Sequence, residues 1–193
     1  MRPCPARARV RGSGLVRRAR GAAAGKERGM PLETGARAPE FTLKDAAEGR
    51  EHSLAEALKA GPVLISIYKS SCQASKTIFP FLERIYQQYP KDRLTVWGIA
   101  QDSPNVTRSF ARRYGVTFPL LVDQDDYATS RAYDIMATPS VFLINQQGEI
   151  VWQGMGFQKP AMDDLSAEVA KLLGVEPVDI TSGTDDVPPW VPG

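Results

Sequence analysis

Two short and almost uninterrupted runs of aliphatic residues constrain the fold of this chain more than any other feature. Residues 63–68 read Val-Leu-Ile-Ser-Ile-Tyr, and residues 94–100 read Leu-Thr-Val-Trp-Gly-Ile-Ala. A strand with one face in water alternates between apolar and polar residues, whereas a strand that is buried on both faces is apolar throughout. Both runs therefore predict central strands of a sheet whose two faces are covered.

Helical patterns separate these strands from one another and from shorter ones. Residues 74–89 place Ile78 and Ile85 on one face of a helix, with Pro80 inside it. Ser53 and Glu56 have the spacing of a capping box at the start of another helix. Further helices are expected at 104–114, 127–133 and 160–173, and further strands at 38–43, 118–123, 140–144 and 149–153. This alternation predicts an α/β fold with a parallel core and an antiparallel hairpin at its edge.

The two ends of the chain differ in composition from its middle. Residues 1–29 hold nine basic residues and one acidic residue, although the net charge of all 193 residues is only +2. The rest is therefore acidic and offers no general basic surface for nucleic acid. We expect a disordered basic extension over residues 1–34, a domain over residues 35–175, and a loose, extended, acidic and proline-rich tail over residues 176–193. Three interpretations of the extension stay open: a stretch before a true start at Met30, a tail that binds nucleic acid or an anionic surface, or a targeting segment.

Other counts exclude whole classes of protein. Two cysteines, Cys4 and Cys72, exclude a disulfide-rich scaffold and a cysteine-based zinc cluster, and a single histidine argues against His-rich metal sites. We expect neither a metal nor a cofactor. No apolar run approaches the roughly 18–20 residues of a transmembrane helix, and no apolar segment of a secretory signal follows the basic start. These observations favour a cytoplasmic location.

Cys72 is the first candidate for chemistry. It follows the predicted strand 63–68 within four residues and directly precedes the predicted helix. A thiol at a helix N-terminus faces unpaired backbone N–H groups and the positive end of the helix dipole, which favour the thiolate and lower the thiol pKa. Lys69 and Lys76 flank it and are expected to stabilise the thiolate further. The alternative is a small buried hydrophobic residue without reactivity.

The second candidate is the dipeptide Thr138-Pro139, which immediately precedes the strand expected at 140–144. A proline is acceptable at the first residue of a strand. A cis bond before it would leave a backbone edge free to pair with a peptide. Since only about 5% of X–Pro bonds in folded proteins are cis, the proline alone does not establish this.

Several motifs, taken in order, resemble one family. They are the stretch from Gly35 to Leu43, residues 69–82 around Cys72, residues 115–120, and residues 137–140 followed by 147–150. Over residues 35–175 the chain resembles the thioredoxin-like redoxins of the TlpA/ResA group, which are related to the AhpC/TSA proteins. The resemblance implies a thioredoxin-like fold, with a mixed central sheet flanked by helices on both faces. It also implies that Cys72 is the nucleophile and that Thr138 and Pro139 contact the substrate.

The chain departs from this family at the Cys-x-x-Cys motif, which here reads Cys72-Gln-Ala-Ser75. Ser75 cannot resolve a mixed disulfide, although its hydroxyl can donate a hydrogen bond to the thiolate. We therefore expect a thiol-disulfide oxidoreductase with one nucleophilic cysteine, whose partners are a thiol- or disulfide-containing protein and a low-molecular-weight thiol. Two alternatives stay open: a one-cysteine peroxidase or redox sensor, and a non-catalytic module that binds a peptide beside Pro139. Lys69 stands where a peroxiredoxin carries threonine, which disfavours the peroxidase.

Overall fold

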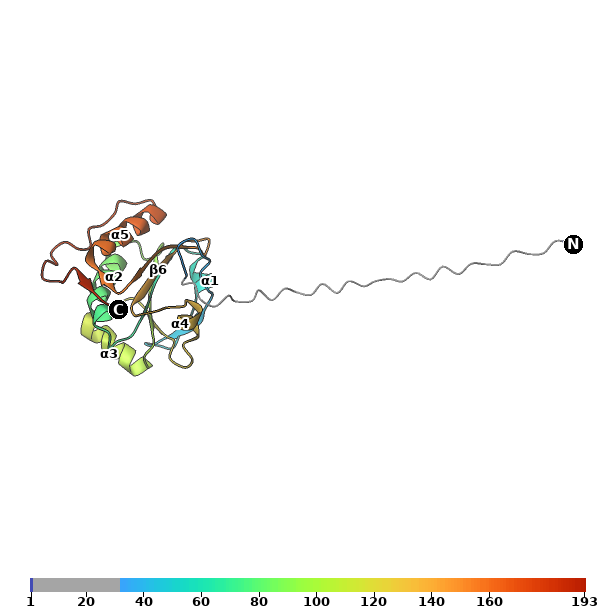
Figure 1. The fold of residues 1–193 in the computed structure, drawn as a ribbon, viewed down its shortest axis with the longest axis horizontal. Coiled ribbons are helices and arrows are strands. Elements are labelled where there is room, and N and C mark those ends of the chain that lie inside the picture. The colour runs from blue at the N-terminus through green and yellow to red at the C-terminus, as the bar shows by residue number, and fades with distance from the viewer. Residues whose placement is uncertain (2–31) are drawn as a thin grey trace.

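The structure is a computed structural model, and it describes Met1 and residues 32–193. Cys4, Met30 and most of the extension predicted over residues 1–34 lie outside the described residues. Seven strands form one sheet in the order β2-β1-β5-β4-β3-β6-β7, and helices cover both of its faces (Figure 1). The predicted class, a mixed α/β sheet between helices, is confirmed.

The elements follow one another closely along the chain. The strands of the sheet are β1 Thr42–Asp45, β2 Glu51–Ser53, β3 Val63–Tyr68, β4 Thr95–Ala100, β5 Leu120–Val122, β6 Ser140–Ile144 and β7 Ile150–Met155. The helices are α1 Leu54–Ala57, α2 Gln73–Gln88, α3 Pro104–Tyr114, α4 Ala128–Ala132 and α5 Lys159–Leu173. Two further short strands, β8 Phe157–Gln158 and β9 Trp190–Val191, form a ladder of their own.

β3 is an interior strand of the sheet, between β4 and β6, and all six of its residues are buried. It runs parallel to β4, with Ile65 opposite Trp97, and antiparallel to β6, with Ile65 opposite Phe142. The parallel set β3-β4-β5 and the β6-β7 hairpin agree with the prediction. Because the carboxyl ends of β3 and β4 meet at one edge of the sheet, the loops that lead into α2 and α3 also meet there.

Two apolar layers fix the helices to the sheet. α2, α3 and α5 lie on one face, and α1 and α4 lie on the other (Figure 1). Tyr68 belongs to the first layer and Ile65 to the second, as the alternation of side chains along a strand requires. Ile78 and Ile85 of α2 are buried in the first layer, in agreement with their helical spacing. α2 is therefore anchored along its length, and its first turn has a fixed position relative to the sheet.

Two expectations near the N-terminal edge of the sheet are wrong. Ser53 is the N-cap residue of α1, but its side chain makes no capping hydrogen bond, and the Glu56 carboxylate instead accepts from Lys59 Nζ at 2.7 Å. The Glu56 side chain can bond either to the backbone at the helix start or to Lys59, and here it bonds to Lys59. The helix itself spans only four residues. The strand expected at 38–43 begins only at Thr42 and pairs with β2, a strand that the sequence pattern did not predict.

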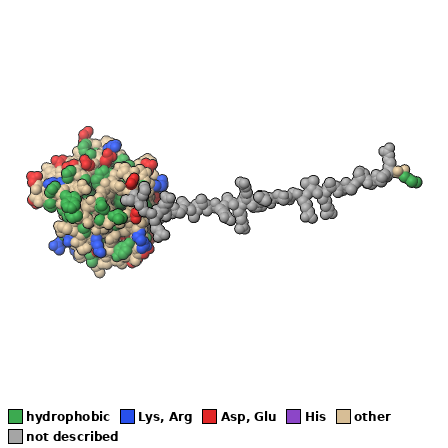
Figure 2. Space-filling view, viewed as in Figure 1, with side chains coloured by type: hydrophobic (Ala, Val, Ile, Leu, Met, Phe, Trp, Pro, Cys, Tyr) green, Lys and Arg blue, Asp and Glu red, His purple; other side chains and the backbone are tan. Residues whose placement is uncertain are grey.

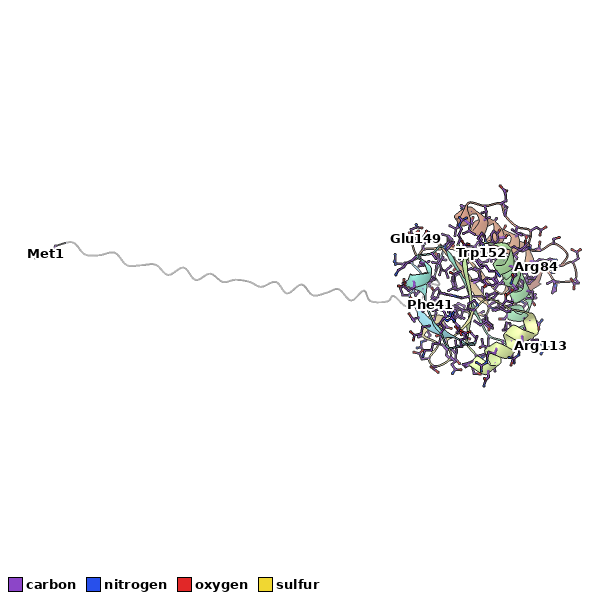
Figure 3. All side chains as sticks on the ribbon, turned by 180° about the vertical axis from the view of Figure 1, so that it is seen from behind. Met1, Phe41, Arg84, Arg113, Glu149 and Trp152 are labelled. Carbon is purple, nitrogen blue, oxygen red and sulfur yellow. The ribbon has the colours of Figure 1, made fainter. Side chains whose placement is uncertain are left out.

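The expectation of a loose tail is also wrong, because residues after α5 pack back onto the domain. Ile180 is fully buried, and Val187 and Val191 contact the first apolar layer. Arg84 of α2, labelled in Figure 3, donates from Nη1 to the backbone oxygens of Ile180 at 2.7 Å and Ser182 at 3.0 Å. Isolated apolar residues in this irregular segment thus contact the core, although the sequence has no periodic pattern that would predict these contacts.

The surface carries both signs of charge. Figure 2 shows hydrophobic side chains near the middle of one face, with acidic and basic side chains mostly around its rim. Within the described part of the chain, no helix has the length and apolar character needed to cross a membrane.

Candidate active site

Cys72 lies where β3 passes into α2, and it is the N-cap residue of that helix. Its backbone N–H donates to the Lys69 carbonyl oxygen at 3.1 Å, and its own carbonyl oxygen accepts from the Lys76 N–H at 3.2 Å, which closes the first helical turn. The sulfur therefore faces the N–H groups of the first turn, which have no carbonyl partner within the helix. This is the position that the order strand, cysteine, helix predicts.

The pKa of the Cys72 thiol is set by opposing effects. Partial burial of the sulfur raises the pKa, but nearby hydrogen-bond donors that favour the thiolate outweigh it and hold the pKa below its ordinary value. They come from the backbone N–H and the hydroxyl of Ser75, the backbone N–H of Ala74 and the side chain of Thr138. Donors that stabilise the anion make the thiolate, which is the nucleophilic form, more abundant at neutral pH.

Ser75 has an environment suited to this task. Its side chain is fully buried, and its Oγ has no hydrogen-bond partner among the described residues. A buried hydroxyl without a partner carries a free-energy cost that is relieved when a partner becomes available. Loss of the thiol proton supplies that partner, so the hydroxyl favours the thiolate over the thiol. Two other buried hydroxyls in the described residues, those of Ser66 and Tyr68 on β3, also have no partner.

Thr138 approaches the sulfur from a distant part of the sequence. In the thiol form, Cys72 Sγ donates to the Thr138 carbonyl oxygen at 3.0 Å. The Thr138-Pro139 peptide bond is cis. The loop is held by Ser140, whose hydroxyl donates to the Ala137 carbonyl oxygen at 2.8 Å. The structure thus brings together Cys72, Ser75, Thr138 and Pro139, as the sequence analysis expected.

The two lysines do not join this cluster. Lys69 is exposed and Lys76 is half-buried, and the lowered pKa of Cys72 arises from hydrogen bonds rather than from either ammonium group. Lys76 instead lines a cavity of about 490 Å³ between α2 and the segment after α5, together with Arg84 and Thr184. Their role in stabilising the thiolate stays a prediction without a contact that supports it.

One positioning residue escaped the sequence analysis. The Asp102 carboxylate accepts a hydrogen bond from the backbone N–H of Ser70 at 2.6 Å and so holds the loop that leads to Cys72. The signal was present, because Asp102 follows β4 by two residues and the carboxyl ends of β3 and β4 share one edge of the sheet. Across residues 32–193, no three His, Cys, Asp or Glu side chains are placed to hold a metal ion together.

Comparisons with known proteins agree with this geometry. The sequence profile of the AhpC/TSA family matches residues 34–153. The thiol-disulfide oxidoreductase ResA of Geobacillus thermodenitrificans (strain NG80-2) is 31% identical over 120 residues, which cover 62% of this chain and 67% of the relative. A protein of Coxiella burnetii (strain RSA 493 / Nine Mile phase I), described as a peroxiredoxin, bcp, is 30% identical over 160 residues, which cover 75% of this chain and all of the relative.

A solved structure extends the comparison to the fold. A Chlorobium tepidum protein, described as the thiol:disulfide interchange protein DsbE, superposes with a TM-score of 0.67 at 22% identity. The match covers 74% of this chain and 99% of the other. At this identity the likeness is one of fold, because one fold can carry unrelated activities.

Proposed function

Because this chain belongs to the AhpC/TSA family and has a thioredoxin-like fold, we propose that it is a thiol-disulfide oxidoreductase with one nucleophile, Cys72. The observation that carries the proposal is the placement of Cys72 at the N-cap of α2 with a lowered pKa. A structural cysteine needs neither this position nor nearby donors that favour its anion. The ResA relatives, which are named for this activity, support the same conclusion.

The first step is an exchange at sulfur. The Cys72 thiolate attacks one sulfur of a disulfide in a partner protein, a bond forms between the two sulfur atoms, and the original disulfide bond breaks. The leaving sulfur departs as a thiolate with the electron pair of the broken bond and takes a proton from solvent. Ser75 and the first-turn N–H groups stabilise the attacking thiolate before the step. Thr138 and Pro139 lie beside the sulfur and contact the partner.

The second step needs a thiol from outside this site. Ser75 occupies the position from which a second cysteine would attack, and a hydroxyl does not displace a thiolate from a disulfide. The thiolate of a low-molecular-weight thiol, or of the partner itself, therefore attacks the mixed disulfide and releases Cys72. The attacking thiol ends in the new disulfide, and Cys72 leaves as a thiolate in its original oxidation state.

The test uses the Cys4→Ser chain, so that Cys72 is the only thiol. We expect oxidised glutathione to add one glutathione group, located at Cys72 by peptide mapping, and reduced glutathione to remove it. The matched control is the same chain with Cys72→Ser, which should gain no mass. A chain that stays unmodified while its thiol is accessible to a small alkylating agent would refute the proposal.

A second candidate function, a one-cysteine peroxidase, is favoured by the relative described as a peroxiredoxin. Here the Cys72 thiolate attacks a peroxide oxygen, the O–O bond breaks, and sulfenic acid and an alcohol or water form; an external thiol then reduces the sulfenic acid. Trapping with dimedone distinguishes the two. Labelling of Cys72 at equimolar peroxide within seconds supports the peroxidase, and labelling only at large excess supports the oxidoreductase.

Two further expectations stay predictions within this proposal. The partners are a protein that carries a thiol or disulfide and a low-molecular-weight thiol. The cytoplasmic location inferred from the sequence is not tested by the structure, and a fluorescent fusion expressed in the source cells would test it.

A further inference from the structure

The chain returns to the active site after it has left α5. Residues 187–193, here called the strap, run along β8, where Phe157 pairs with Val191 in an antiparallel ladder. The backbone N–H of Lys159 donates to the Pro189 carbonyl oxygen at 2.9 Å and ties the strap to the start of α5. β9 also lies against α2, the helix that begins after Cys72. β8, the start of α5 and α2 thus hold the strap in place.

The end of the strap touches the same carbonyl group as the nucleophile. A Cβ atom added at Gly193 would lie 2.9 Å from the Thr138 carbonyl oxygen and 3.2 Å from Ala137 Cβ. That carbonyl oxygen is the one to which Cys72 Sγ donates. The backbone at Gly193 therefore occupies space directly beside the Thr138 backbone, where the residues of a bound polypeptide would have to lie.

Gly156 lies directly against the backbone of the strap. Its N–H donates to the Pro139 carbonyl oxygen at 2.9 Å, and its φ is +70°. A Cβ atom at this position would approach both Gly193 N and the Val191 carbonyl oxygen to 3.0 Å. An added methyl group would crowd the strap backbone, which would have to shift to make room, and the positive φ adds strain, so Gly156→Ala should weaken the attachment of the strap.

We propose that the strap gates the active site by size: small disulfides reach Cys72 past the strap, whereas a polypeptide substrate has to displace it. The inference rests on the proposed function. Cys72 is half-buried rather than fully buried, and we expect a small disulfide to need less space around the sulfur than a polypeptide does. A polypeptide extends on both sides of its own cysteine and needs the space that Gly193 fills.

The strap is suited to being displaced. It holds only two ladder residues, and Trp190 is 59% exposed, so the apolar contacts of the strap are made mainly by Val187 and Val191. Pro188, Pro189 and Pro192 keep the segment extended after release, because the ring of each proline fixes its φ angle. The segment therefore gains little conformational entropy when it leaves, and it is ready to return.

The experiment compares two probes with the same leaving group on the Cys4→Ser chain. One is the aromatic disulfide 5,5′-dithiobis(2-nitrobenzoate), and the other is an eight-residue peptide whose central cysteine carries the same nitrothiobenzoate group as a mixed disulfide. In both, the Cys72 thiolate forms a new S–S bond and the aryl thiolate leaves with the electron pair, so its absorbance gives both rates. The aryl thiolate is the better leaving group, which directs attack to the peptide sulfur.

Two variants release the strap in different ways. Gly156→Ala places a methyl group against the strap backbone, and Val191→Asp puts a charge where the strap contacts the apolar layer. Gly49→Ala is the matched control, because Gly49 has a φ of +71° but nothing within 4 Å of an added Cβ. If about one molecule in ten is open at rest, full release raises the peptide rate about tenfold. The rate with the small disulfide should change less than about twofold, and the control should change neither rate.

Each outcome decides the matter. A peptide rate that stays unchanged in both variants, while amide exchange at Lys159 accelerates and shows that the strap has left, overturns the gate. Equal acceleration of both probes also overturns it, because the strap would then shield the sulfur without regard to size. Slow Lys159 exchange in both variants and an unchanged peptide rate show a strap that is not displaceable, which overturns the proposal too. A wild-type Cys72 that reacts with neither probe contradicts the proposed function instead.

Discussion

The reactivity of Cys72 depends on a handful of atoms whose effects have opposite signs. Burial opposes the thiolate, and the donors supplied by Ser75, Ala74 and Thr138 favour it. The Ser75 hydroxyl differs from the backbone donors because it can be removed without a change in the helix. It is therefore the atom through which the balance can be tested.

Removal of that hydroxyl should make Cys72 less acidic. In Ser75→Ala we expect the pKa of Cys72 to rise, because a hydrogen bond to a charged acceptor contributes about 1.5–3 kcal/mol, and the alkylation rate at pH 7 to fall roughly tenfold. The thiolate is the reactive form, so the rate in both proteins should increase with pH and level off, with the wild-type curve at lower pH. Iodoacetamide labelling against pH measures this. Thr77→Ala, on the same helix with its hydroxyl bonded to the Gln73 carbonyl oxygen, is the control.

The substitution Ser75→Cys should convert the site to one with two cooperating thiols. Cys72 is the N-cap residue and residue 75 lies in the first turn of α2, so the two sulfurs face each other across one helical turn. We expect a disulfide on mild oxidation, seen as a loss of two hydrogens in the mass spectrum, and a gain of insulin reductase activity over the wild type, which we expect to be weak in this assay. Two free thiols that persist under an oxidant able to convert other Cys-x-x-Cys sites would contradict the assigned position of Cys72.

At the scale of elements, agreement with the sequence follows the strength of the local pattern. β3 is found at the residues predicted for it, since a run of six residues that is apolar except for Ser66 and has β-branched members fits little else. α3 spans Pro104–Tyr114, as predicted, since proline is favoured at the first position of a helix, and the structure shows that it ends at Gly115, which has a φ of +65°. β2 was missed because three polar residues carry no periodicity, and their pairing with β1 depends on a turn around Gly49.

The same reasoning explains what could be foreseen of the site. Cys72 and Thr138 could be named from the sequence because each stands at the end of a recognisable element. The contact between them depends on the order of β3 and β6 in the sheet, which local patterns do not encode. The docking of Ile180 and Val191 is likewise a tertiary effect, set by gaps in the apolar layer that only the folded chain defines.

β4 contains the tightest packing constraint in the sheet. A Cβ atom at Gly98 would lie 2.5 Å from Leu120 Cδ2 and 3.2 Å from ring atoms of Phe79 and Tyr68. We expect Gly98→Ala to lower the free energy of unfolding by about 1–3 kcal/mol, as overpacked cores do. Urea denaturation followed by circular dichroism measures the change.

A double-mutant cycle identifies the cause. Leu120→Ala alone should destabilise by about 2–5 kcal/mol because it leaves a cavity. Combined with Gly98→Ala, it should cost less than the two single changes together, since the methyl group then enters space that Leu120 has vacated. Strict additivity would show that the loss in Gly98→Ala comes from elsewhere.

At the scale of the whole molecule, Arg84 joins the helix that follows Cys72 to the segment after α5. Its guanidinium donates to two backbone oxygens and lies 5.7 Å from the centre of the Phe81 ring. We expect Arg84→Ala to lower the free energy of unfolding by about 1–3 kcal/mol and to increase proteolysis around residues 180–182. Arg113→Ala, which removes a cation 5.9 Å from the Tyr114 ring on α3, is the control and should leave the protease pattern unchanged. An identical pattern in both variants would show that apolar contacts alone hold the segment.

Ser75 also affects the lifetime of the mixed disulfide between Cys72 and its partner. Where a second cysteine stands in the same helical turn, escape from a covalent complex is intramolecular, and its rate does not depend on the surrounding solution. In the proposed mechanism the complex between Cys72 and its partner has no such internal exit, so its lifetime varies inversely with the concentration of free thiol around it. The complex would persist while oxidants deplete that thiol and dissolve once it is replenished. The redox state of the surroundings would therefore set how long the protein stays bound to its partner.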